Sequence, residues 1–226
     1  MRLALYYTPP EHHPLSRAAA AWLGRDPWRA STAATAGPPG PEDIVREPRR
    51  YGFHATLKAP FRLAGGRTVD ALRSALGDFC AAAQAVEIPE IALERIGPFF
   101  ALVPAREPPV LQALAASVVQ AFEPFRAPLT AEEVARRRPE RLSSREREYL
   151  SAWGYPYVLD AFRFHMTLTG PVPEDGREAI EAILRRRFAA FIGRPLAVDA
   201  LALFVEPDSP GDFVIDCAFA LAASRG

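Results

Sequence analysis

The sequence contains one pattern twice: residues 53–60 read Phe-His-Ala-Thr-Leu-Lys-Ala-Pro, and residues 164–171 read Phe-His-Met-Thr-Leu-Thr-Gly-Pro. The Phe, His, Thr, Leu and Pro positions are identical in the two copies. The two histidines, His54 and His165, are separated by close to half of the 226 residues. A repeat at this spacing indicates that the chain arose by duplication of one unit.

The segments that follow the two copies are also alike. Each proline is followed by a polar turn and an amphipathic helix; the first helix begins after Thr68, and the second carries Ile180 and Leu184 on its apolar face. Strand-like segments follow each helix, at 91–96 and 99–103 in the first half and at 201–205 and 213–221 in the second. Both halves therefore predict the order strand, helix, strand, strand.

The repeat predicts a single domain over residues 1–226 that is built from two lobes. The lobe with the His54 copy should cover about residues 1–105, and the lobe with the His165 copy about residues 106–226. The rest of the chain predicts a strand at 3–7, helices at 14–23 and 108–122, and a surface loop over the Ala-, Gly- and Pro-rich residues 30–48.

Residues 130–150 are strongly charged and predict two short helices. Each helix has a capping box at its start, formed by Thr130 with Glu133 and by Ser143 with Glu146. The run Arg136-Arg137-Arg138 falls at the end of the first helix. Such a run is usually a solvated helix end that complements the helix dipole, and a ligand-binding patch is the alternative.

Composition argues against several classes of function. Basic and acidic residues are equal in number, so the formal net charge is zero, whereas a protein that binds long nucleic acid usually has a basic excess. No apolar run is long enough to span a bilayer and the N-terminus lacks the features of a signal peptide, so we expect a cytoplasmic protein that binds no membrane. No zinc-ligand spacing, Walker A loop or GxGxxG motif occurs, so the sequence predicts no metal site and no cofactor.

The two copies of the pattern read as strands, on which side chains alternate between faces. The polar face carries His54, Thr56 and Lys58 in the first copy, and Arg163, His165, Thr167 and Thr169 in the second. The opposite faces are apolar. We therefore expect the polar faces to line a cleft and the apolar faces to enter the core.

These polar side chains fit phosphoryl chemistry. Two imidazoles with ordinary pKa values of ~6.5 can serve as a base and an acid near neutral pH. Threonine hydroxyls can donate to phosphate oxygens, and Lys58 and Arg163 can stabilise the additional negative charge of a transition state. Packing explains why a duplication kept Phe, Leu and Pro, but not why it kept His and Thr. His12 and His13 lie in a proline-rich turn without a matching partner, and we interpret them as surface residues.

In its paired His-x-Thr motifs, His54-Ala55-Thr56 and His165-Met166-Thr167, the sequence resembles the 2H phosphoesterase superfamily. The longer strings at 50–61 and 162–171, and the N-terminal Tyr6-Tyr7-x-Pro9, resemble a branch linked to phosphonate metabolism and often encoded beside the carbon–phosphorus lyase machinery. The resemblance covers essentially the whole chain. It implies an α+β fold in which two pseudo-symmetric antiparallel sheets, flanked by helices, enclose a central cleft.

The resemblance also implies an activity. Members of the superfamily cleave cyclic or 2′,5′-type phosphodiesters without a metal or cofactor. On this chain, one of His54 and His165 would deprotonate water and the other would protonate the leaving ribose oxygen. Thr56 and Thr167 would hold the phosphoryl oxygens. Lys58 stands where the second copy has Thr169, so the two sides of the site differ, and the sequence does not assign the base and the acid.

The branch suggests a substrate. Phosphonate breakdown by carbon–phosphorus lyase yields a 5-phosphoribosyl 1,2-cyclic phosphate, which a 2H enzyme in that setting could open. We therefore expect a monomeric hydrolase that acts on a small phosphorylated molecule. The candidates for a basic pocket around the 5-phosphate are Arg50, Arg163 and the Arg136–Arg138 run. Tyr51 or Tyr6 would stack or hydrogen-bond at the cleft, with core packing as the alternative.

Two other functions remain open on the sequence. The first is an RNA or nucleotide 2′,3′-cyclic phosphodiesterase, which would apply the same chemistry to a short RNA end or a mononucleotide. The second is a non-catalytic sensor of a phosphate ligand on the same scaffold, although a binding module needs no acid–base pair.

Overall fold

The computed structural model describes residues 1–29, 41–208 and 210–223, which form an α+β fold with antiparallel sheets. Seven strands form the larger sheet in the order β4-β5-β6-β2-β1-β8-β9, and β3 pairs with β7 in a second, two-stranded sheet. The strands are β1 (Arg2–Tyr7), β2 (Ala55–Phe61), β3 (Val86–Ile88), β4 (Ile91–Ile96), β5 (Phe99–Pro104), β6 (Met166–Thr167), β7 (Leu196–Val198), β8 (Ala200–Glu206) and β9 (Val214–Ala220).

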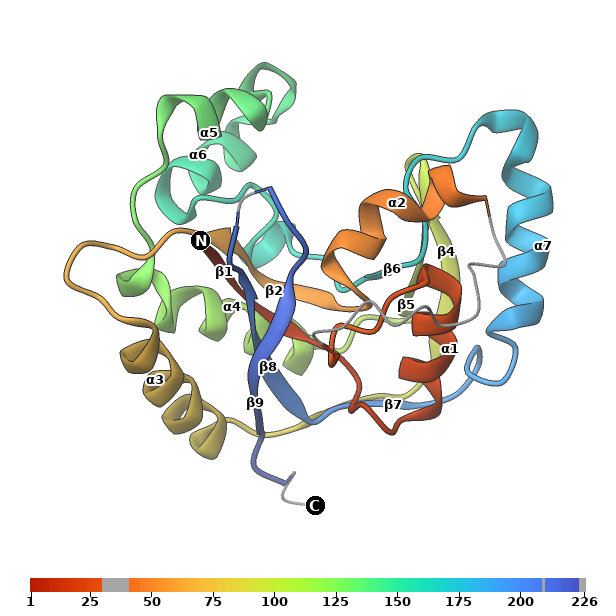
Figure 1. Ribbon diagram of the computed structural model, residues 1–226, viewed down its shortest axis with the longest axis horizontal. Helices are drawn as coiled ribbons and strands as arrows, with labels where there is room; N and C mark the ends of the chain where they lie inside the picture. The colour runs from red at the N-terminus through yellow and green to blue at the C-terminus, as the bar shows by residue number, and fades with distance from the viewer. Residues whose placement is uncertain (30–40, 209, 224–226) are drawn as a thin grey trace.

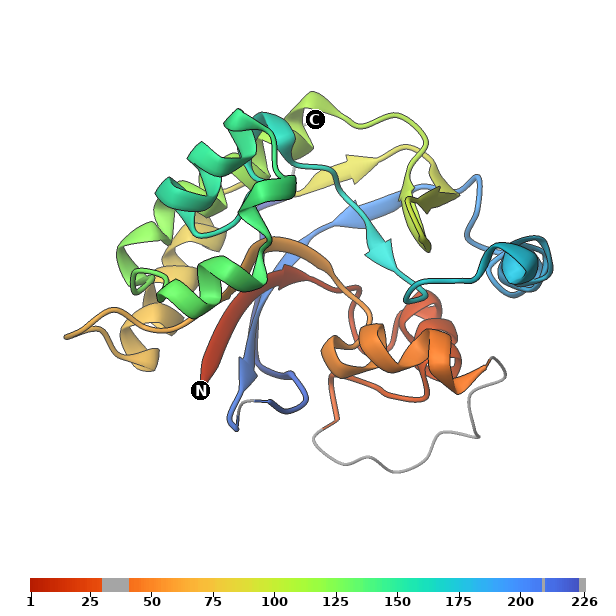
Figure 2. The same ribbon diagram turned by 90° about the horizontal axis from the view of Figure 1, so that it is seen from above.

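Helices cover the larger sheet and both ends of the molecule (Figure 1). They are α1 (Pro14–Leu23), α2 (Glu42–Tyr51), α3 (Val69–Ala82), α4 (Pro109–Ala121), α5 (Ala131–Arg136), α6 (Ser144–Trp153) and α7 (Arg177–Arg187). Helix α3 packs against β8 and β9, and α4 packs against β2. Helices α5 and α6 lie at one end of the molecule and α7 at the opposite end, as both Figure 1 and Figure 2 show. In the described part of the chain, no helix is long and apolar enough to cross a membrane.

The same elements follow the two motif strands. Strand β2 is followed by α3, β3, β4 and β5, and β6 is followed by α7, β7, β8 and β9. The predicted order of strand, helix, strand, strand is therefore confirmed, with one additional short strand in each half. The two additional strands, β3 and β7, pair with each other.

The larger sheet interleaves strands from both halves of the sequence (Figure 1). Strands β4 and β5 come from the first half and lie beside β6, whereas β8 and β9 come from the second half and lie beside β1. The motif strands β2 and β6 are neighbours in the middle of the sheet. The boundary near residue 105 thus separates the two sequence repeats but not two groups of strands, because the hairpin that ends each repeat pairs with strands of the other.

The apolar side chains of both motif copies enter the core, as predicted. Phe53 and Phe164 are 1% and 0% exposed, and Leu57 and Leu168 are equally buried. Trp22 of α1 is fully buried and donates its indole N–H to the carbonyl of Leu168 at 2.7 Å. The motif strands are therefore held from the core side by packing, which leaves their other faces free for a site.

Local capping agrees with the sequence. The side chains of Thr68, Thr130 and Ser143 accept hydrogen bonds from the backbone N–H groups of Ala71, Glu133 and Glu146, respectively. Both predicted capping boxes are complete. The charged segment 130–150 forms the two predicted helices because each first turn has its backbone donors satisfied locally.

Helix α2 corrects the prediction of a loop over residues 30–48. Residues 30–40 lie outside the described part of the chain, but α2 begins at Glu42 and buries Ile44 and Val45. Pro48 lies inside this helix and cannot donate to the carbonyl four residues earlier, which belongs to Ile44. That carbonyl instead accepts the N–H of Gly170 at 2.5 Å. The proline that argued against a helix therefore frees an acceptor that ties α2 to the second motif.

The second motif forms a shorter strand than the pattern predicts. Strand β6 consists of Met166–Thr167 alone. The N–H groups of Leu168 and Thr169 both bond to the carbonyl of Phe100, at 2.9 and 3.3 Å, so the regular ladder with β5 is interrupted there.

Candidate active site

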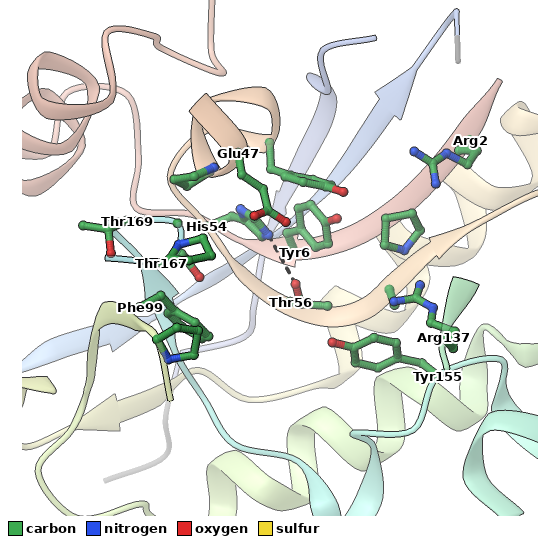
Figure 3. A pocket seen from close by; sticks show the side chains of 17 residues that line it. Arg2, Tyr6, Glu47, His54, Thr56, Phe99, Arg137, Tyr155, Thr167 and Thr169 are labelled. Carbon is green, nitrogen blue, oxygen red and sulfur yellow. Dashed lines mark hydrogen bonds between the residues drawn. The ribbon is translucent and has the colours of Figure 1, made fainter. Parts of the chain in front are cut away.

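A cavity of about 420 Å³ lies against the central strands of the sheet (Figure 3). It is lined by Arg2, Tyr6, Glu47, Pro48, Tyr51, His54, Thr56, Ala59, Pro60, Pro98, Phe99, Arg137, Tyr155, Thr167, Thr169, Gly170 and Pro171. Residues predicted for the site that line it are Tyr6, Tyr51, His54, Thr56, Thr167 and Thr169. The structure therefore brings together polar residues from both copies of the motif.

His54 is held at both ring nitrogens. Its Nδ1 lies 2.9 Å from the carbonyl oxygen of Gly52, and its Nε2 lies 3.2 Å from the hydroxyl of Thr56. A carbonyl oxygen can only accept, so the neutral ring must carry its proton on Nδ1. Nε2 then carries a lone pair, which faces the cavity and accepts a hydrogen bond from the hydroxyl of Thr56. This is the tautomer that a general base requires at Nε2.

Gly52 aims the carbonyl that fixes this tautomer. It follows α2 with φ of 72°, a left-handed conformation that glycine adopts without strain. A Cβ atom at this position would lie 2.6 Å from the Cβ of Pro27. Glycine is therefore required at residue 52 both for the turn and for the close approach of the neighbouring chain.

Aromatic rings enclose His54. The ring of Tyr6 stacks on it with 3.9 Å between centroids and 24° between planes, and Tyr51 lies 5.8 Å away in a tilted arrangement. Burial lowers the pKa of His54 to about 4, although the Gly52 carbonyl acts in the opposite direction, and a charge on His165 would lower it further. His54 is therefore neutral at pH 7 in the free protein.

His165 repeats the orientation of His54. Its Nδ1 lies 2.8 Å from the carbonyl oxygen of Arg163, again two residues earlier in the chain. His165 is not among the residues that line the cavity; its half-buried ring lies 5.9 Å from the ring of Phe99, which does line it. Burial lowers the pKa of His165 and the charge of Arg163 lowers it further, while the Arg163 carbonyl raises it. In both histidines the backbone carbonyl thus holds Nδ1, which leaves Nε2 as the nitrogen without a proton when the ring is neutral.

The pairing of β2 with β6 sets the two motifs against each other. Ala55 lies opposite Met166 in antiparallel register. The middle residues of the two His-x-Thr motifs are therefore cross-strand neighbours, which brings the two motifs side by side.

Thr169 lines the cavity but also has a structural role. Its side chain is fully buried, and its hydroxyl oxygen accepts the N–H of Phe100 at 3.0 Å. The hydroxyl hydrogen remains able to donate. Thr169 thus closes the interrupted ladder between β6 and β5 at the edge of the cavity.

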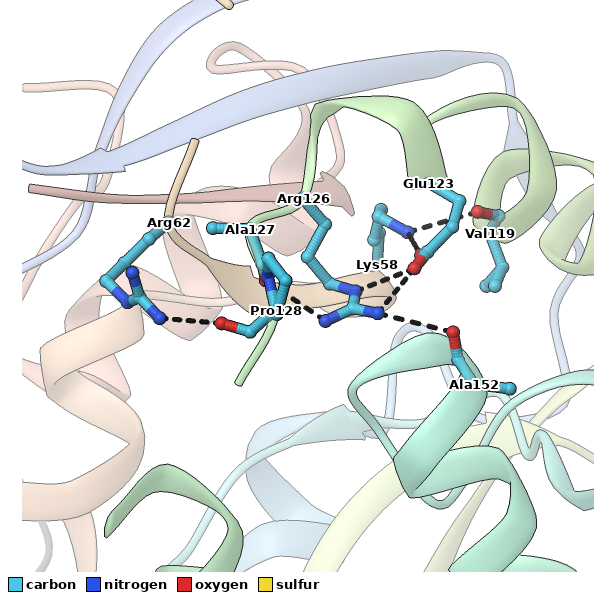
Figure 4. A network of polar contacts seen from close by, with 8 residues as sticks. All are labelled: Lys58, Arg62, Val119, Glu123, Arg126, Ala127, Pro128 and Ala152. Carbon is cyan, nitrogen blue, oxygen red and sulfur yellow. Dashed lines mark hydrogen bonds and ion pairs between the residues drawn. The ribbon is translucent and has the colours of Figure 1, made fainter. Parts of the chain in front are cut away.

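Lys58 does not line the cavity, contrary to the prediction. Its side chain is buried on the α4 side of β2, where Nζ donates to the carbonyl of Val119 at 3.0 Å and to Glu123 Oε2 at 2.9 Å (Figure 4). Glu123 also accepts from Arg126, whose Nη2 reaches the carbonyl of Ala152 in α6. The only lysine of the chain therefore joins β2 to α4, and through Arg126 to α6.

Irregular pairing explains the orientation of Lys58. Along β1 the partners run from Leu3 with Phe61, to Leu5 with Lys58, to Tyr6 with Thr56, so β2 contains an extra residue in two places. A bulge places two consecutive side chains on one face. Lys58 accordingly follows Leu57 into the interior, and Ala59 and Pro60 both face the cavity. The alternation that predicts Lys58 beside Thr56 assumes a regular strand.

Two predicted arginines also lie away from the cavity. Arg163 is exposed and pairs with Glu94 on β4, so only its backbone carbonyl contributes to the site. Arg50 donates to the carbonyl of Gly211 at 2.7 Å and pairs with the buried Glu206. Both guanidinium groups are occupied by partners from distant parts of the chain, which the sequence could not identify.

Five charged or aromatic lining residues were not singled out individually from the sequence: Arg2, Glu47, Phe99, Arg137 and Tyr155. Arg2 could have been found from the sequence, because it is four residues before Tyr6 and so lies on the same face of β1. Arg137 was considered only as part of the Arg136–Arg138 run, of which it alone lines the cavity. Within residues 1–29, 41–208 and 210–223, no group of three or more His, Cys, Asp or Glu is placed to hold a metal ion.

The family described as "Protein of unknown function (DUF1045)" matches residues 56–214, which is most of the chain. The chain belongs to the DUF1045 family. Two curated relatives are both named "Ribose 1,5-bisphosphate phosphokinase PhnN". The one from Janthinobacterium sp. (strain Marseille) is 38% identical over 222 residues, which is 94% of this chain and 49% of the relative. The one from Laribacter hongkongensis (strain HLHK9) is 33% identical over 215 residues, which is 94% of this chain and 50% of the relative. This DUF1045 chain thus spans about half the length of the curated relatives it matches.

Solved structures that are similar over nearly the whole chain have low identity to it. A protein of Thermus thermophilus, TT0787, has a TM-score of 0.49 at 16% identity and covers 100% of both chains. E. coli LigT complexed with 3'-AMP has a TM-score of 0.47 at 15% identity and covers 97% of both chains. A structure titled as that of a phosphoesterase has a TM-score of 0.48 at 16% identity, covering 98% of both chains.

Proposed function

We propose that this DUF1045 chain is a phosphoesterase that opens a small cyclic phosphodiester by acid–base catalysis with His54 and His165. The observation that carries the proposal is the repeated orientation of the two imidazoles. In each, Nδ1 lies within hydrogen-bond distance of the carbonyl two residues earlier, at 2.9 and 2.8 Å, which leaves Nε2 to transfer protons. Packing alone requires neither a second histidine nor a matched tautomer.

The reaction needs one neutral and one protonated histidine. Nε2 of the neutral histidine removes a proton from water as the water oxygen forms a bond to phosphorus. Nε2–H of the protonated histidine gives its proton to the ester oxygen as the bond from phosphorus to that oxygen breaks. The product is a phosphomonoester with a free hydroxyl, and the two histidines have exchanged protonation states. Proton exchange with solvent restores the starting state.

We assign the base to His54 and the acid to His165. His54 is the more enclosed of the two, because Tyr6 stacks on it at 3.9 Å, and its pKa of about 4 keeps it neutral. His165 lies beside Phe99, and the negative charge of a bound phosphate would favour its protonated form, against the lowering of its pKa by burial. The assignment fits the requirement for one neutral and one charged ring.

Thr56 couples the proton transfer to binding of the phosphoryl group. Its hydroxyl donates to Nε2 of neutral His54, 3.2 Å away. Once Nε2 takes the proton from water, it becomes a donor and Thr56 can accept from it. The hydroxyl hydrogen is then free to bond a nonbridging phosphate oxygen, whose negative charge is largest at that moment. Thr167, on the opposing strand, offers a second hydroxyl to the same group.

Three features support a ribose phosphate as the substrate class. The cavity of about 420 Å³ suits one small ligand rather than a polymer. The motif strings resemble the branch linked to phosphonate breakdown. The curated relatives are named for ribose 1,5-bisphosphate. Those relatives are also named as kinases, but this chain has no Walker A loop and its single lysine is buried in an ion pair. We therefore propose hydrolysis, with 5-phosphoribosyl 1,2-cyclic phosphate as the leading substrate.

A metal-free substrate panel tests this function. The purified chain, with EDTA present, is incubated with 5-phosphoribosyl 1,2-cyclic phosphate, 2′,3′-cyclic nucleotides and a 2′,3′-cyclic RNA end, and phosphomonoester products are measured. Hydrolysis of the ribosyl compound in preference to the nucleotides supports the proposal. Preference for the nucleotides or RNA end favours the nucleotide 2′,3′-cyclic phosphodiesterase. Tight binding of a cyclic phosphate without cleavage of any compound favours the sensor.

An activated ester tests which histidine is the acid. The leaving group of bis(p-nitrophenyl) phosphate departs without being protonated, so loss of the acid should matter little for this ester. We expect His165→Ala to retain most of the wild-type rate on the aryl ester, and His54→Ala to lose it. Equal losses in the two variants would reject the assignment.

A further inference from the structure

Two arginines lie at one end of the cavity, away from the threonines of the second motif. Arg2 comes from the start of β1, and Arg137 follows the last turn of α5. In Figure 3 both guanidinium groups are on the same side of Tyr6, whereas Thr167 and Thr169 are on the other. His54 and Thr56 lie between these ends. The cavity is therefore polarised along its length.

Arg137 is available to a ligand. Its half-buried guanidinium lies 4.9 Å from the centroid of the Tyr155 ring, which also lines the cavity. Among the residues that the structure describes, no carboxylate pairs with it. The neighbouring Arg136 and Arg138 are exposed and do not line the cavity. The end of α5 therefore directs one arginine of the run inward.

Arg2 is held in place by a partner that leaves part of it free. Its Nε donates to Glu206 Oε2 at 2.5 Å, and Glu206 is fully buried. The other carboxylate oxygen, Oε1, accepts from Arg50 and from the N–H of Gly211. The two terminal nitrogens of Arg2 form no hydrogen bond within the described ranges, and the guanidinium carbon lies 5.6 Å from the centroid of the Phe213 ring. The single carboxylate of Glu206 thus pairs with both Arg2 and Arg50, so a net positive charge remains at this end of the cavity.

We infer that Arg137 and Arg2 form a second anion-binding subsite, which takes a terminal phosphate monoester of the substrate while the phosphodiester lies at the two histidines. Guanidinium groups bind phosphate through paired N–H donors, and two of them match a dianion. Three tyrosines that line the cavity, Tyr6, Tyr51 and Tyr155, offer ring faces and hydroxyls to the sugar. The inference rests on the proposed function for the identity of the reacting group.

The proposed subsite predicts a preference for substrates that carry a 5-phosphate, and a single substitution should remove this preference. Ribose 1,2-cyclic phosphate is compared with and without a 5-phosphate, using wild type, Arg137→Gln and the matched control Arg136→Gln. Hydrogen bonds to charged groups are worth about 1.5–3 kcal/mol, which corresponds to roughly 10- to 100-fold in rate. We expect Arg137→Gln to lower kcat/KM by that factor for the 5-phosphorylated compound and to change it little for the other. Arg136→Gln should resemble wild type on both compounds. Equal effects of Arg137→Gln on the two compounds, or none on either, would overturn the inference.

A binding measurement separates failure of the subsite from failure of the proposed function. Ribose 5-phosphate, which has no phosphodiester, is titrated calorimetrically into wild type and into the two arginine variants. Binding that Arg137→Gln weakens at least tenfold and Arg136→Gln leaves unchanged supports the subsite even where no cyclic phosphate is hydrolysed. No binding by wild type, together with equal hydrolysis of the two cyclic compounds, rejects the subsite and leaves the proposed function standing.

Discussion

Replacing Lys58 by methionine separates two roles for the only lysine of the chain. Methionine keeps a long apolar stem but removes the charge and its three N–H donors. If Lys58 acted on the substrate, as the sequence predicts, the variant would lose activity and keep its stability. The structure predicts the reverse, because Nζ lies 2.9 Å from Glu123 Oε2 and 3.0 Å from the carbonyl of Val119, away from the cavity.

The size of the expected stability loss follows from the contacts of Glu123. Removing one partner of a buried ion pair usually costs about 3–5 kcal/mol, because the other charge is left unpaired. Here Glu123 keeps Arg126, whose Nη2 and Nε lie 2.5 and 2.9 Å from Oε1, and 23% of the Glu123 side chain is exposed. We therefore expect Lys58→Met to lower the free energy of unfolding by about 2–3 kcal/mol and Tm by roughly 4–12 °C.

Thermal and urea unfolding at pH 7 measure this loss, and kcat/KM is measured well below Tm. The control is Arg46→Met, which removes an exposed ion pair with Asp43 whose side chains are 70% and 83% exposed. Exposed pairs contribute at most about 1 kcal/mol, so the control should unfold almost as wild type does. We expect kcat/KM of Lys58→Met to stay close to wild type. An unchanged Tm with a hundredfold loss of kcat/KM would refute the placement of Lys58 outside the site.

Two further predictions concern His54 and the turn before it. Gly52→Ala should destabilise the protein by more than Gly66→Ala, because both glycines have positive φ, at 72° and 76°, but only at Gly52 would the new Cβ clash, 2.6 Å from Pro27. Left-handed strain alone costs about 1–2 kcal/mol and would affect both variants. Equal losses in the free energy of unfolding, measured with urea, would therefore contradict a clash at residue 52. The free energy of unfolding should fall as pH decreases from 6.5 toward 4, because unfolded His54 gains a proton near 6.5 and the folded residue only near pH 4. His54 contributes up to about 1.4 kcal/mol per pH unit to this dependence. The variant His54→Ala should therefore show a shallower dependence of unfolding free energy on pH, by that amount. Identical pH dependence in wild type and variant would argue against a buried, neutral His54.

The repeat and the elements after it could be predicted because they depend on local patterns. Helix α1 and the helices that follow the motifs have apolar positions at helical spacing, and the caps at Thr68, Thr130 and Ser143 are formed by residues three positions apart. The convergence of His54, Thr56, Thr167 and Thr169 on one cavity follows from the same pattern. The orientation of each imidazole toward the carbonyl two residues earlier is also local, but it depends on the bend at Gly52 and on the pairing of β2 with β6.

The positions of Lys58, Arg163 and Arg50 were predicted wrongly because the residues that hold them are distant in the sequence. The bulges that turn Lys58 inward arise from the pairing of β2 with β1. Arg163 and Arg50 are held by Glu94 and by Glu206, which belong to other strands. An alternating pattern has no information about such partners. The division into lobes, the monomeric state and the cytoplasmic location stay predictions.

The rate of cyclic phosphate hydrolysis in single histidine variants tests the central claim most directly. Wild type, His54→Ala, His165→Ala and the control His12→Ala, which changes an exposed histidine outside the cavity, are assayed with EDTA on 5-phosphoribosyl 1,2-cyclic phosphate. Acid–base catalysis by both rings predicts a loss of at least ~10²-fold in each site variant, with melting curves that still show a folded protein, and no loss in the control. Near-wild-type activity in either His54→Ala or His165→Ala would contradict the two-histidine mechanism.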